Sequence, residues 1–171
     1  MSETKTSNQE EAVLEFLNKN NIPYTIVHHE ALFTMDGYEK IEKELGCMIP
    51  KNLFLTNRQQ TKFYLLMMPG DKKFLTKEIS SQISSARLSF GSEEKLNEML
   101  SCYKGSTSLF GLLFDKNKEV HPLIDEDILK QEYLGFHPCQ NTATIKIHSK
   151  DMLKILSLLD RKYTTITLKG K

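Results

Sequence analysis

The sequence predicts a single α+β domain in which a mixed, largely antiparallel sheet is surrounded by helices. The chain has 171 residues, of which 39% are hydrophobic and 26% charged, as expected for one globular domain. Helical patterns and short β-like runs are interspersed, and several runs are separated only by tight turns, which favours antiparallel pairing. The sequence shows no linker and no internal repeat. Residues 1–7 are predicted to be a flexible polar tail, and residues 8–171 one domain.

The N-terminal part is predicted to contain two helices and one short strand. Apolar residues recur at helical spacing over residues 8–20, with Ser7 or Asn8 as the N-cap. A β-branched run over residues 24–28 indicates a strand. The second helix begins after a cap at Thr34 or Asp36 and ends at Gly46.

The middle of the chain is rich in β patterns. Two apolar runs, residues 52–56 and 62–68, are separated by a polar turn and predict a hairpin. The continuous apolar character of the first run is typical of a strand that is buried on both faces. After the hairpin we expect a helix over residues 76–83, a strand fragment over 88–90, and a helix from a Ser92 cap to Leu100.

The C-terminal part is predicted to hold three further strands before the last helix, and one after it. The strands before it are expected over residues 108–114, 120–124 and 142–148, with a short helix over 125–130. Residues 142–148 alternate between polar and apolar, which is typical of a half-buried strand. Ser149 is expected to cap a helix over 150–160, and residues 163–168 to form a terminal strand.

Composition excludes several classes of function. The net charge is +1, which does not suit a dedicated binder of duplex nucleic acid. Cys47, Cys102 and Cys139 form no CxxC pair or zinc pattern. The common hydrolase and nucleotide-binding motifs are absent as well, so we expect no metal and no cofactor. A polar N-terminus and the absence of a long apolar run favour a cytoplasmic protein without membrane contact.

Three segments contain residues suited to binding or catalysis. Residues 49–55 place Lys51 at the start of a buried strand, where its ammonium can reach a phosphate or carboxylate. Residues 105–111 combine glycine with hydroxyl groups, so backbone N–H groups can approach a ligand. Residues 135–142 contain His137 in a turn. Each also has a plain interpretation: a solvated lysine, an ordinary loop, or a structural histidine.

The other four histidines, His28, His29, His121 and His148, stand in no comparable context. We assign them no role from the sequence.

Taken together, the segments resemble the YbaK-type and prolyl-tRNA-synthetase-associated editing domains, and among them the free-standing ProX-like deacylases. The resemblance extends from about Glu10 to Leu168. Its motifs are His29–Thr34, Lys51–Leu55, Lys62–Leu65, Gly105–Gly111, Phe136–Pro138 and Asn141–Thr142. One position departs from the family pattern, which usually has proline where this chain has Leu109.

The resemblance implies that residues 8–171 are an editing domain that hydrolyses the ester between an amino acid and the 3′ end of tRNA. Mischarged Ala-tRNA(Pro) is the expected substrate, its acceptor end the expected partner, and prolyl-tRNA synthetase a second candidate partner. In this family the neighbouring ribose hydroxyl is thought to assist the water. Cys-tRNA(Pro), another small residue, or a catalytically inactive binding module of the same fold are the alternatives, and a general esterase is a weaker one.

The same resemblance, with the local chemistry, assigns site residues. Lys51 and His137 are the expected catalytic residues, with Lys51 directed at phosphate or ribose. Backbone N–H groups near Gly105, Ser106 and Gly135 are candidates for binding the carbonyl oxygen. The other expected substrate-binding residues are Phe33, Thr34, Asn52, Leu53, Phe110 and Asn141, of which Phe33, Leu53 and Phe110 should exclude large side chains.

Overall fold

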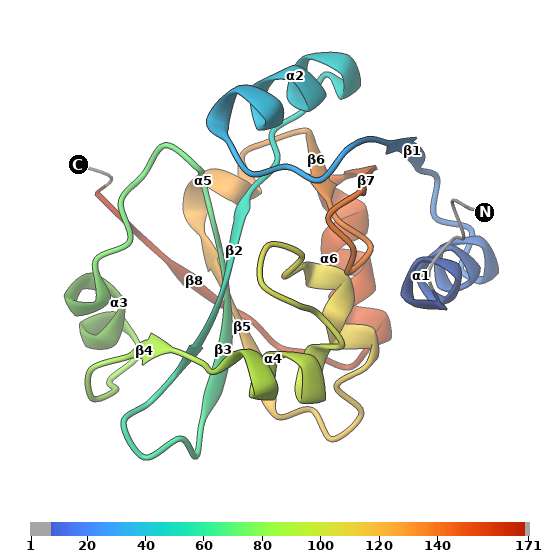
Figure 1. The fold of residues 1–171 in the computed structure, drawn as a ribbon. Helices are drawn as coiled ribbons and strands as arrows, with labels where there is room; N and C mark the ends of the chain where they lie inside the picture. The colour runs from blue at the N-terminus through green and yellow to red at the C-terminus, as the bar shows by residue number, and fades with distance from the viewer. Residues whose placement is uncertain (1–7, 170–171) are drawn as a thin grey trace.

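The computed structural model describes residues 8–169, apart from the side chain of Met35. The predicted tail, residues 1–7, lies outside the described residues. Eight strands form two sheets in this part of the chain (Figure 1). The five-stranded sheet has the order β4-β2-β3-β5-β8, from strands Ser89–Phe90, Lys51–Thr56, Phe63–Met68, Val120–Asp125 and Thr164–Ile166. The three-stranded sheet has the order β1-β7-β6, from strands Thr25–His28, Ala143–His148 and Tyr133–Phe136.

The α+β class and the mainly antiparallel pairing are confirmed, but the strands divide into two sheets where we expected one. β2 and β3 form the predicted antiparallel hairpin, and β1-β7, β6-β7 and β2-β4 are antiparallel too. β5 pairs in parallel with β3 and with β8. A sequence pattern locates a strand along the chain but does not identify its pairing partner. β1 and β7, for example, pair although most of the sequence lies between them.

Seven helical segments surround the sheets. They are α1 (Asn8–Lys19), α2 (Met35–Leu45), α3 (Thr76–Gln82), α4 (Glu93–Leu100), the 3-10 helix η1 (Leu109–Leu113), α5 (Glu126–Leu129) and α6 (Ser149–Leu158) within the described part. The predicted caps are confirmed at Thr34 and Ser92, whose side chains accept N–H groups of the first turn, and at Gly46, which ends α2 in a left-handed conformation. The cap of α6 is His148, not Ser149.

One predicted element is wrong, and one strand was not predicted. Residues 108–114 are not a strand: the Ser108 hydroxyl accepts the Phe110 N–H and starts η1. A buried apolar run of this length fits either conformation, so its pattern does not decide between them. Strand β6 was not predicted, because the tyrosine, leucine, glycine and phenylalanine of this strand form only a short run beside a turn.

The β2–β3 hairpin lies between two hydrophobic cores, which explains its continuous apolar sequence. Phe63, Leu65 and Met67 of β3 face the main core. That core is shared with α1, α4, α6 and the three-stranded sheet. The alternate side chains of β3 face a second core that contains Ile79 of α3 and Leu168. α2 covers a third, smaller cluster next to the start of β2.

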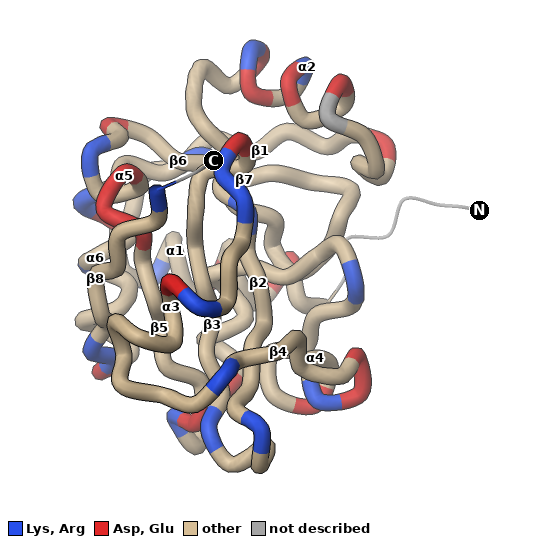
Figure 2. The backbone as a smooth tube through the Cα atoms, turned by 90° about the vertical axis from the view of Figure 1, so that its left-hand side faces the viewer, with Lys and Arg blue, Asp and Glu red and all other residues tan. Residues whose placement is uncertain are grey.

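The surface carries both charge signs on the side seen in Figure 2, in line with the net charge of +1. Among the described residues, no helix has the length and apolar character to span a membrane.

Candidate functional site

A cavity of about 470 Å³ lies where the start of β2, the end of β6 and α2 meet. The turn after β3 and the loop at residues 105–107 complete its wall. Its polar and glycine lining residues are Tyr38, Glu39, Glu42, Lys51, Asn52, Gly70, Asp71, Gly105, Thr107 and His137, and its apolar ones are Met48, Ile49, Pro50 and Phe136. The three segments singled out in the sequence thus contribute to one cavity.

Strand pairing explains why distant segments meet here. Lys51 is paired with Met68, so the start of β2 lies beside the turn that follows β3. The Gly135 N–H donates to Met48 O (2.8 Å), which joins the segment before β2 to β6. A Cβ at Gly135 would lie 3.0 Å from Thr144 and 3.2 Å from Ile49, so glycine permits this close approach.

His137 is buried (5% exposed) and presents one nitrogen without a partner. Its Nδ1 lies 2.8 Å from Ala143 O, and a carbonyl only accepts, so Nδ1 carries the proton. Burial lowers the pKa of His137 to about 4, against a smaller raising effect of the Ala143 hydrogen bond; the neighbouring His29 lowers it further. The neutral ring therefore offers the lone pair of Nε2, which has no hydrogen-bond partner among the described residues.

Asn52 offers a second acceptor and Lys51 a cation. The Asn52 side-chain N–H donates to Pro50 O (3.1 Å), which leaves Oδ1 buried and unpartnered in the described part of the chain. Lys51, the first residue of β2, is exposed at the rim of the cavity.

The remaining polar lining is mainly acidic. Glu39 and Glu42 come from α2, and Asp71 from the turn after β3. Glu42 is oriented by the Ile49 N–H, which donates to Oε2 (2.8 Å). Burial raises the pKa of Tyr38, so its hydroxyl keeps its proton at neutral pH. Carboxylates and neutral acceptors therefore surround a cavity with a single lysine among its lining residues.

Gly105 and Thr107, in the loop at residues 105–107, line the cavity. Gly105 has φ +94°, a conformation that favours glycine, and its N–H has no hydrogen bond within the described residues. The Ser106 N–H is already used, because it donates to Tyr103 O (2.8 Å), and the Ser106 hydroxyl is bonded to Tyr103 as well. Of the N–H groups expected to bind a carbonyl oxygen, those of Ser106 and Gly135 are occupied, while that of Gly105 remains a candidate.

Asn141 and Thr34 support the site from behind rather than lining it. Asn141 is buried and makes two hydrogen bonds with the Leu32 backbone. Its Oδ1 accepts the Leu32 N–H (3.2 Å), and its Nδ2 donates to Leu32 O (3.0 Å). Thr34 accepts the Gly37 N–H as the cap of α2. Both residues hold the segment that leads into α2, and α2 forms one wall of the cavity.

The three residues predicted to exclude large side chains do not line this cavity. Phe33 is 84% exposed, and Phe110 is fully buried against Phe136 in the main core. Leu53 packs against the second core. Their side chains point to solvent or to a core. Leu53 faces the second core because side chains alternate along β2, and Phe110 is buried at the start of η1. The apolar wall is formed by Met48, Ile49, Pro50 and Phe136 instead.

Four polar lining residues were not predicted from the sequence: Tyr38, Glu39, Glu42 and Asp71. Tyr38 and Glu42 are four residues apart on α2 and so share one helix face, a spacing that was available in the sequence. His29, which was assigned no role, lies near the site: its ring centroid is 6.1 Å from that of His137, and its Nε2 is 2.8 Å from Thr144 Oγ1.

A cavity of about 610 Å³ lies at the other end of the hairpin, around His121. Its histidine already has a hydrogen-bond partner, since His121 Nε2 lies 2.7 Å from Thr164 Oγ1. No group of three or more histidine, cysteine, aspartate or glutamate side chains in residues 8–169 could hold a metal.

Comparison with known proteins decides the family. Residues 29–155 match the model of the aminoacyl-tRNA editing domain. This chain belongs to the aminoacyl-tRNA editing domain family. The match contains every lining residue of the cavity, from Tyr38 to His137.

Individual members of the aminoacyl-tRNA editing domain family are similar over nearly the whole chain. The prolyl-tRNA editing protein ProX of Acetoanaerobium sticklandii is 33% identical over 158 residues, covering 92% of this chain and 96% of its own. A prolyl-tRNA synthetase associated domain-containing protein of Danio rerio is 26% identical, with 90% and 83% covered. A solved structure described as a candidate trans-editing enzyme for prolyl tRNA synthetase has TM-score 0.72 at 16% identity, covering 98% of this chain and 100% of its own.

These findings confirm the predicted resemblance and the mixed α+β class. The predicted class of activity, hydrolytic editing of aminoacyl-tRNA, is the one for which the aminoacyl-tRNA editing domain family is named.

Proposed function

We propose that this protein is a trans-editing deacylase that hydrolyses the aminoacyl ester of mischarged tRNA(Pro), with alanine as the amino acid removed. Residues 8–171 would form the editing domain, and the tRNA acceptor end would be the partner in the cytoplasm. The observation that supports this most directly is the division of the cavity into a cationic rim at Lys51 and an acceptor-rich interior at His137 and Asn52. Its similarity to a prolyl-tRNA editing protein supports the choice of tRNA.

The acceptor-rich interior suits the α-ammonium group of an aminoacyl ester. An ammonium has three N–H donors and no acceptor, so it complements His137 Nε2 and Asn52 Oδ1, neither of which has a partner in the described structure. Glu39 and Asp71 add negative charge nearby. A buried acceptor without a donor is costly, and the bound ammonium would remove that cost.

The cationic rim suits the nucleotide end of the substrate. The Lys51 ammonium would bind the phosphate or ribose of the terminal adenosine, which leaves the ester between the two ends of the cavity. Few phosphate contacts of this kind predict weak tRNA affinity and a modest dependence on salt.

Hydrolysis at this position needs little more than orientation. The oxygen of water adds to the ester carbonyl carbon and the bond to the ribose oxygen breaks. One proton of the water passes to that ribose oxygen and the other to solvent, so the amino acid leaves as a carboxylate. We propose that the neighbouring ribose hydroxyl orients the water and that the Gly105 N–H stabilises the oxyanion. Orientation supplies about 7–11 kcal/mol in favourable cases, and one oxyanion donor about 3–4 kcal/mol.

Selection against larger amino acids would come from the apolar wall. Met48, Ile49 and Phe136 lie on it, and a small site can refuse the bulkier proline by steric conflict. Cysteine or another small residue is the alternative substrate, because one additional group changes binding by only about 1–3 kcal/mol.

Side-by-side deacylation of Ala-, Cys-, Ser- and Pro-tRNA(Pro) tests the proposal. We expect the fastest turnover with Ala-tRNA(Pro) and none above background with Pro-tRNA(Pro). Fastest turnover of Cys-tRNA(Pro) would change the substrate but keep the class. Tight binding of charged tRNA without turnover of any would contradict the enzyme and favour an inactive binding module. Leu109, the departure that suggested such a module, is fully buried in η1 and does not line the cavity.

A further inference from the structure

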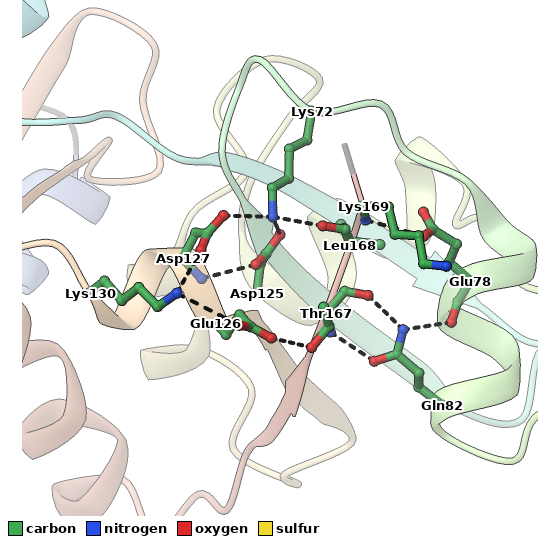
Figure 3. A network of polar contacts seen from close by, with 10 residues as sticks. All are labelled: Lys72, Glu78, Gln82, Asp125, Glu126, Asp127, Lys130, Thr167, Leu168 and Lys169. Atoms are coloured by element: carbon green, nitrogen blue, oxygen red, sulfur yellow. Dashed lines mark hydrogen bonds and ion pairs between the residues drawn. The ribbon is translucent and has the colours of Figure 1, made fainter. Parts of the chain in front are cut away.

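The turn that follows β3 has two sides with different contacts. Gly70 and Asp71 line the cavity. The next residue, Lys72, extends into a polar cluster formed by α5 and the C-terminal segment, drawn in Figure 3. The hydrogen bond that closes the turn runs from the Lys72 N–H to Pro69 O (3.2 Å). One short turn therefore links the cavity wall to a separate cluster of charges.

The ammonium of Lys72 is saturated within that cluster. Its Nζ lies 2.8 Å from Asp125 Oδ2, 2.8 Å from Asp127 Oδ2 and 2.8 Å from Leu168 O. An ammonium has three N–H donors, so the three oxygens use all of them. The Lys72 side chain is 14% exposed and that of Asp125 is fully buried, so water screens this pair little.

The oxygens around Lys72 are themselves held in place. The other oxygen of Asp125 accepts the Asp127 N–H (3.0 Å) at the start of α5. Leu168 is buried in the second core. On either side of it, Thr167 exchanges two hydrogen bonds with Gln82 (2.7 Å each), and the Lys169 N–H donates to Glu78 Oε2 (3.1 Å).

The pKa shifts of Lys72 and Asp127 both favour the charged forms. Burial lowers the pKa of Lys72, but hydrogen bonds and the charges of Asp125 and Asp127 outweigh this effect and raise it. The hydrogen bond from Lys72 lowers the pKa of Asp127.

We propose that Lys72 is a positioning residue, which fixes the turn so that Gly70 and Asp71 keep their places in the cavity wall. A cation bound to three fixed oxygens has one favourable position, whereas a turn at the surface held by one backbone hydrogen bond has several. The α-ammonium end of the proposed substrate lies against this wall, so the anchor sets both rate and amino-acid selectivity. This role in catalysis depends on the proposed function; the ordering of the turn does not.

The test compares three variants with the wild-type protein. Lys72→Met removes the cation but leaves Asp125 buried without it, which can destabilise the fold strongly. The double variant Lys72→Met, Asp125→Asn removes both charges of the buried pair, so no buried charge is left without its partner, and the partly exposed Asp127 keeps its contact with Lys130. We therefore expect this variant to fold. Lys118→Met is the matched control, because it breaks an exposed ion pair with Asp160 (2.6 Å) away from the cavity.

Two measurements are made on each variant. Amide hydrogen exchange of residues 70–72 reports the order of the turn without any substrate. Deacylation of Ala- and Ser-tRNA(Pro) gives kcat and KM for each substrate. In the double variant we expect faster exchange in the turn, a kcat/KM for Ala-tRNA(Pro) lower by about 10- to 100-fold, and a changed ratio between the two substrates, at a melting temperature near that of the wild type. The control should match the wild type in all of these.

The outcomes separate this inference from the proposed function. An unchanged rate of amide hydrogen exchange at residues 70–72 in the double variant would overturn the proposal that Lys72 orders the turn. Faster exchange with unchanged kcat/KM and selectivity would overturn its role in catalysis. If the wild-type protein deacylates none of the tRNAs, the proposed function fails and the exchange data alone decide whether Lys72 orders the turn.

Discussion

The cavity at His137 and the cluster at Lys72 are both polar sites next to a hydrophobic core, but they differ in how their polar atoms are satisfied. Every N–H of the Lys72 ammonium has an oxygen at 2.8 Å. His137 Nε2 and Asn52 Oδ1 are buried without partners in the described structure. Because an unsatisfied buried polar atom costs free energy, it is retained where a ligand completes it. The saturated Lys72 ammonium stabilises structure, although Glu78 Oε1 in the same cluster also lacks a partner among the described residues. The unsatisfied acceptors at His137 and Asn52 differ in that their residues line a cavity, which favours binding.

The largest effect is expected at the rim of the cavity. Lys51→Ala should lower kcat/KM for Ala-tRNA(Pro) by about 100- to 1000-fold, which is the size of effect produced by removing one well-placed stabilising group. The melting temperature should stay within a degree or two, since Lys51 is exposed.

Lys62→Ala is the control for that variant, because Lys62 is exposed just before β3, at the opposite end of the same hairpin. Full activity of the Lys51 variant would remove the residue from the mechanism.

A second prediction uses the pH dependence of stability. The folded-state pKa of His137 is about 4, below the ordinary value of 6.5, so the unfolded chain holds more protons between these two values. The contribution of His137 is therefore complete above pH 6.5 and is lost as the pH falls toward 4, by about 3 kcal/mol. Urea unfolding of the wild type and His137→Gln across this range measures it.

In that comparison the difference in unfolding free energy between the two proteins should shrink as the pH falls. A difference that stays constant from pH 7 to pH 4 would contradict the buried neutral imidazole.

The third prediction tests what the unsatisfied acceptors bind. His137→Ala should lower kcat/KM for Ala-tRNA(Pro) by about 10- to 100-fold, the worth of a hydrogen bond to a charged group. Acetylation of the α-amino group of the substrate should lower kcat/KM of the wild type by a similar factor. It should lower kcat/KM of the variant less, because the variant has already lost the contact with the amino group.

The measurement is kcat/KM of the wild type and of His137→Ala, each with Ala-tRNA(Pro) and with its N-acetylated form. Equal losses in the wild type and the variant would mean that His137 does not contact the amino group, and an unchanged rate in His137→Ala would make the residue scaffold.

The smallest effect is expected at the second cavity, where a polar side chain is satisfied as the Lys72 ammonium is. Residue 121 lies in the second cavity, where its histidine is already bonded to Thr164. His121→Gln should change kcat/KM by less than about twofold, and a large loss of deacylation would show that the substrate binds in the second cavity. The same tRNA assay measures it.

Local patterns predicted most elements because their causes are local. The hairpin, the Thr34 and Ser92 caps and the Gly46 end of α2 follow from spacing, turn residues and cap chemistry. The two failures, η1 and β6, are short apolar segments whose conformation depends on what they pack against. A five-residue apolar run suits several conformations until its neighbours are known.

The candidate site was predicted in its segments and only partly in its side chains. Lys51, Asn52, Gly105 and His137 line the cavity. Phe33 and Phe110 do not, because sequence position says nothing about the direction in which a side chain points from a loop or a 3-10 helix. Asp71 was missed because its turn reaches the site only through the pairing of β2 with β3.

The sequence by itself determined the α+β class, the family resemblance and the segments that carry the chemistry, since these depend on residue type and short-range order along the chain. Tertiary structure alone decided that the strands form two sheets, which nitrogen of His137 is left without a partner, and that Lys72 joins the cavity wall to Asp125 and the C-terminal segment. The physical reason is that hydrogen-bond satisfaction and burial are properties of groups brought together from distant positions, and only the folded arrangement defines them.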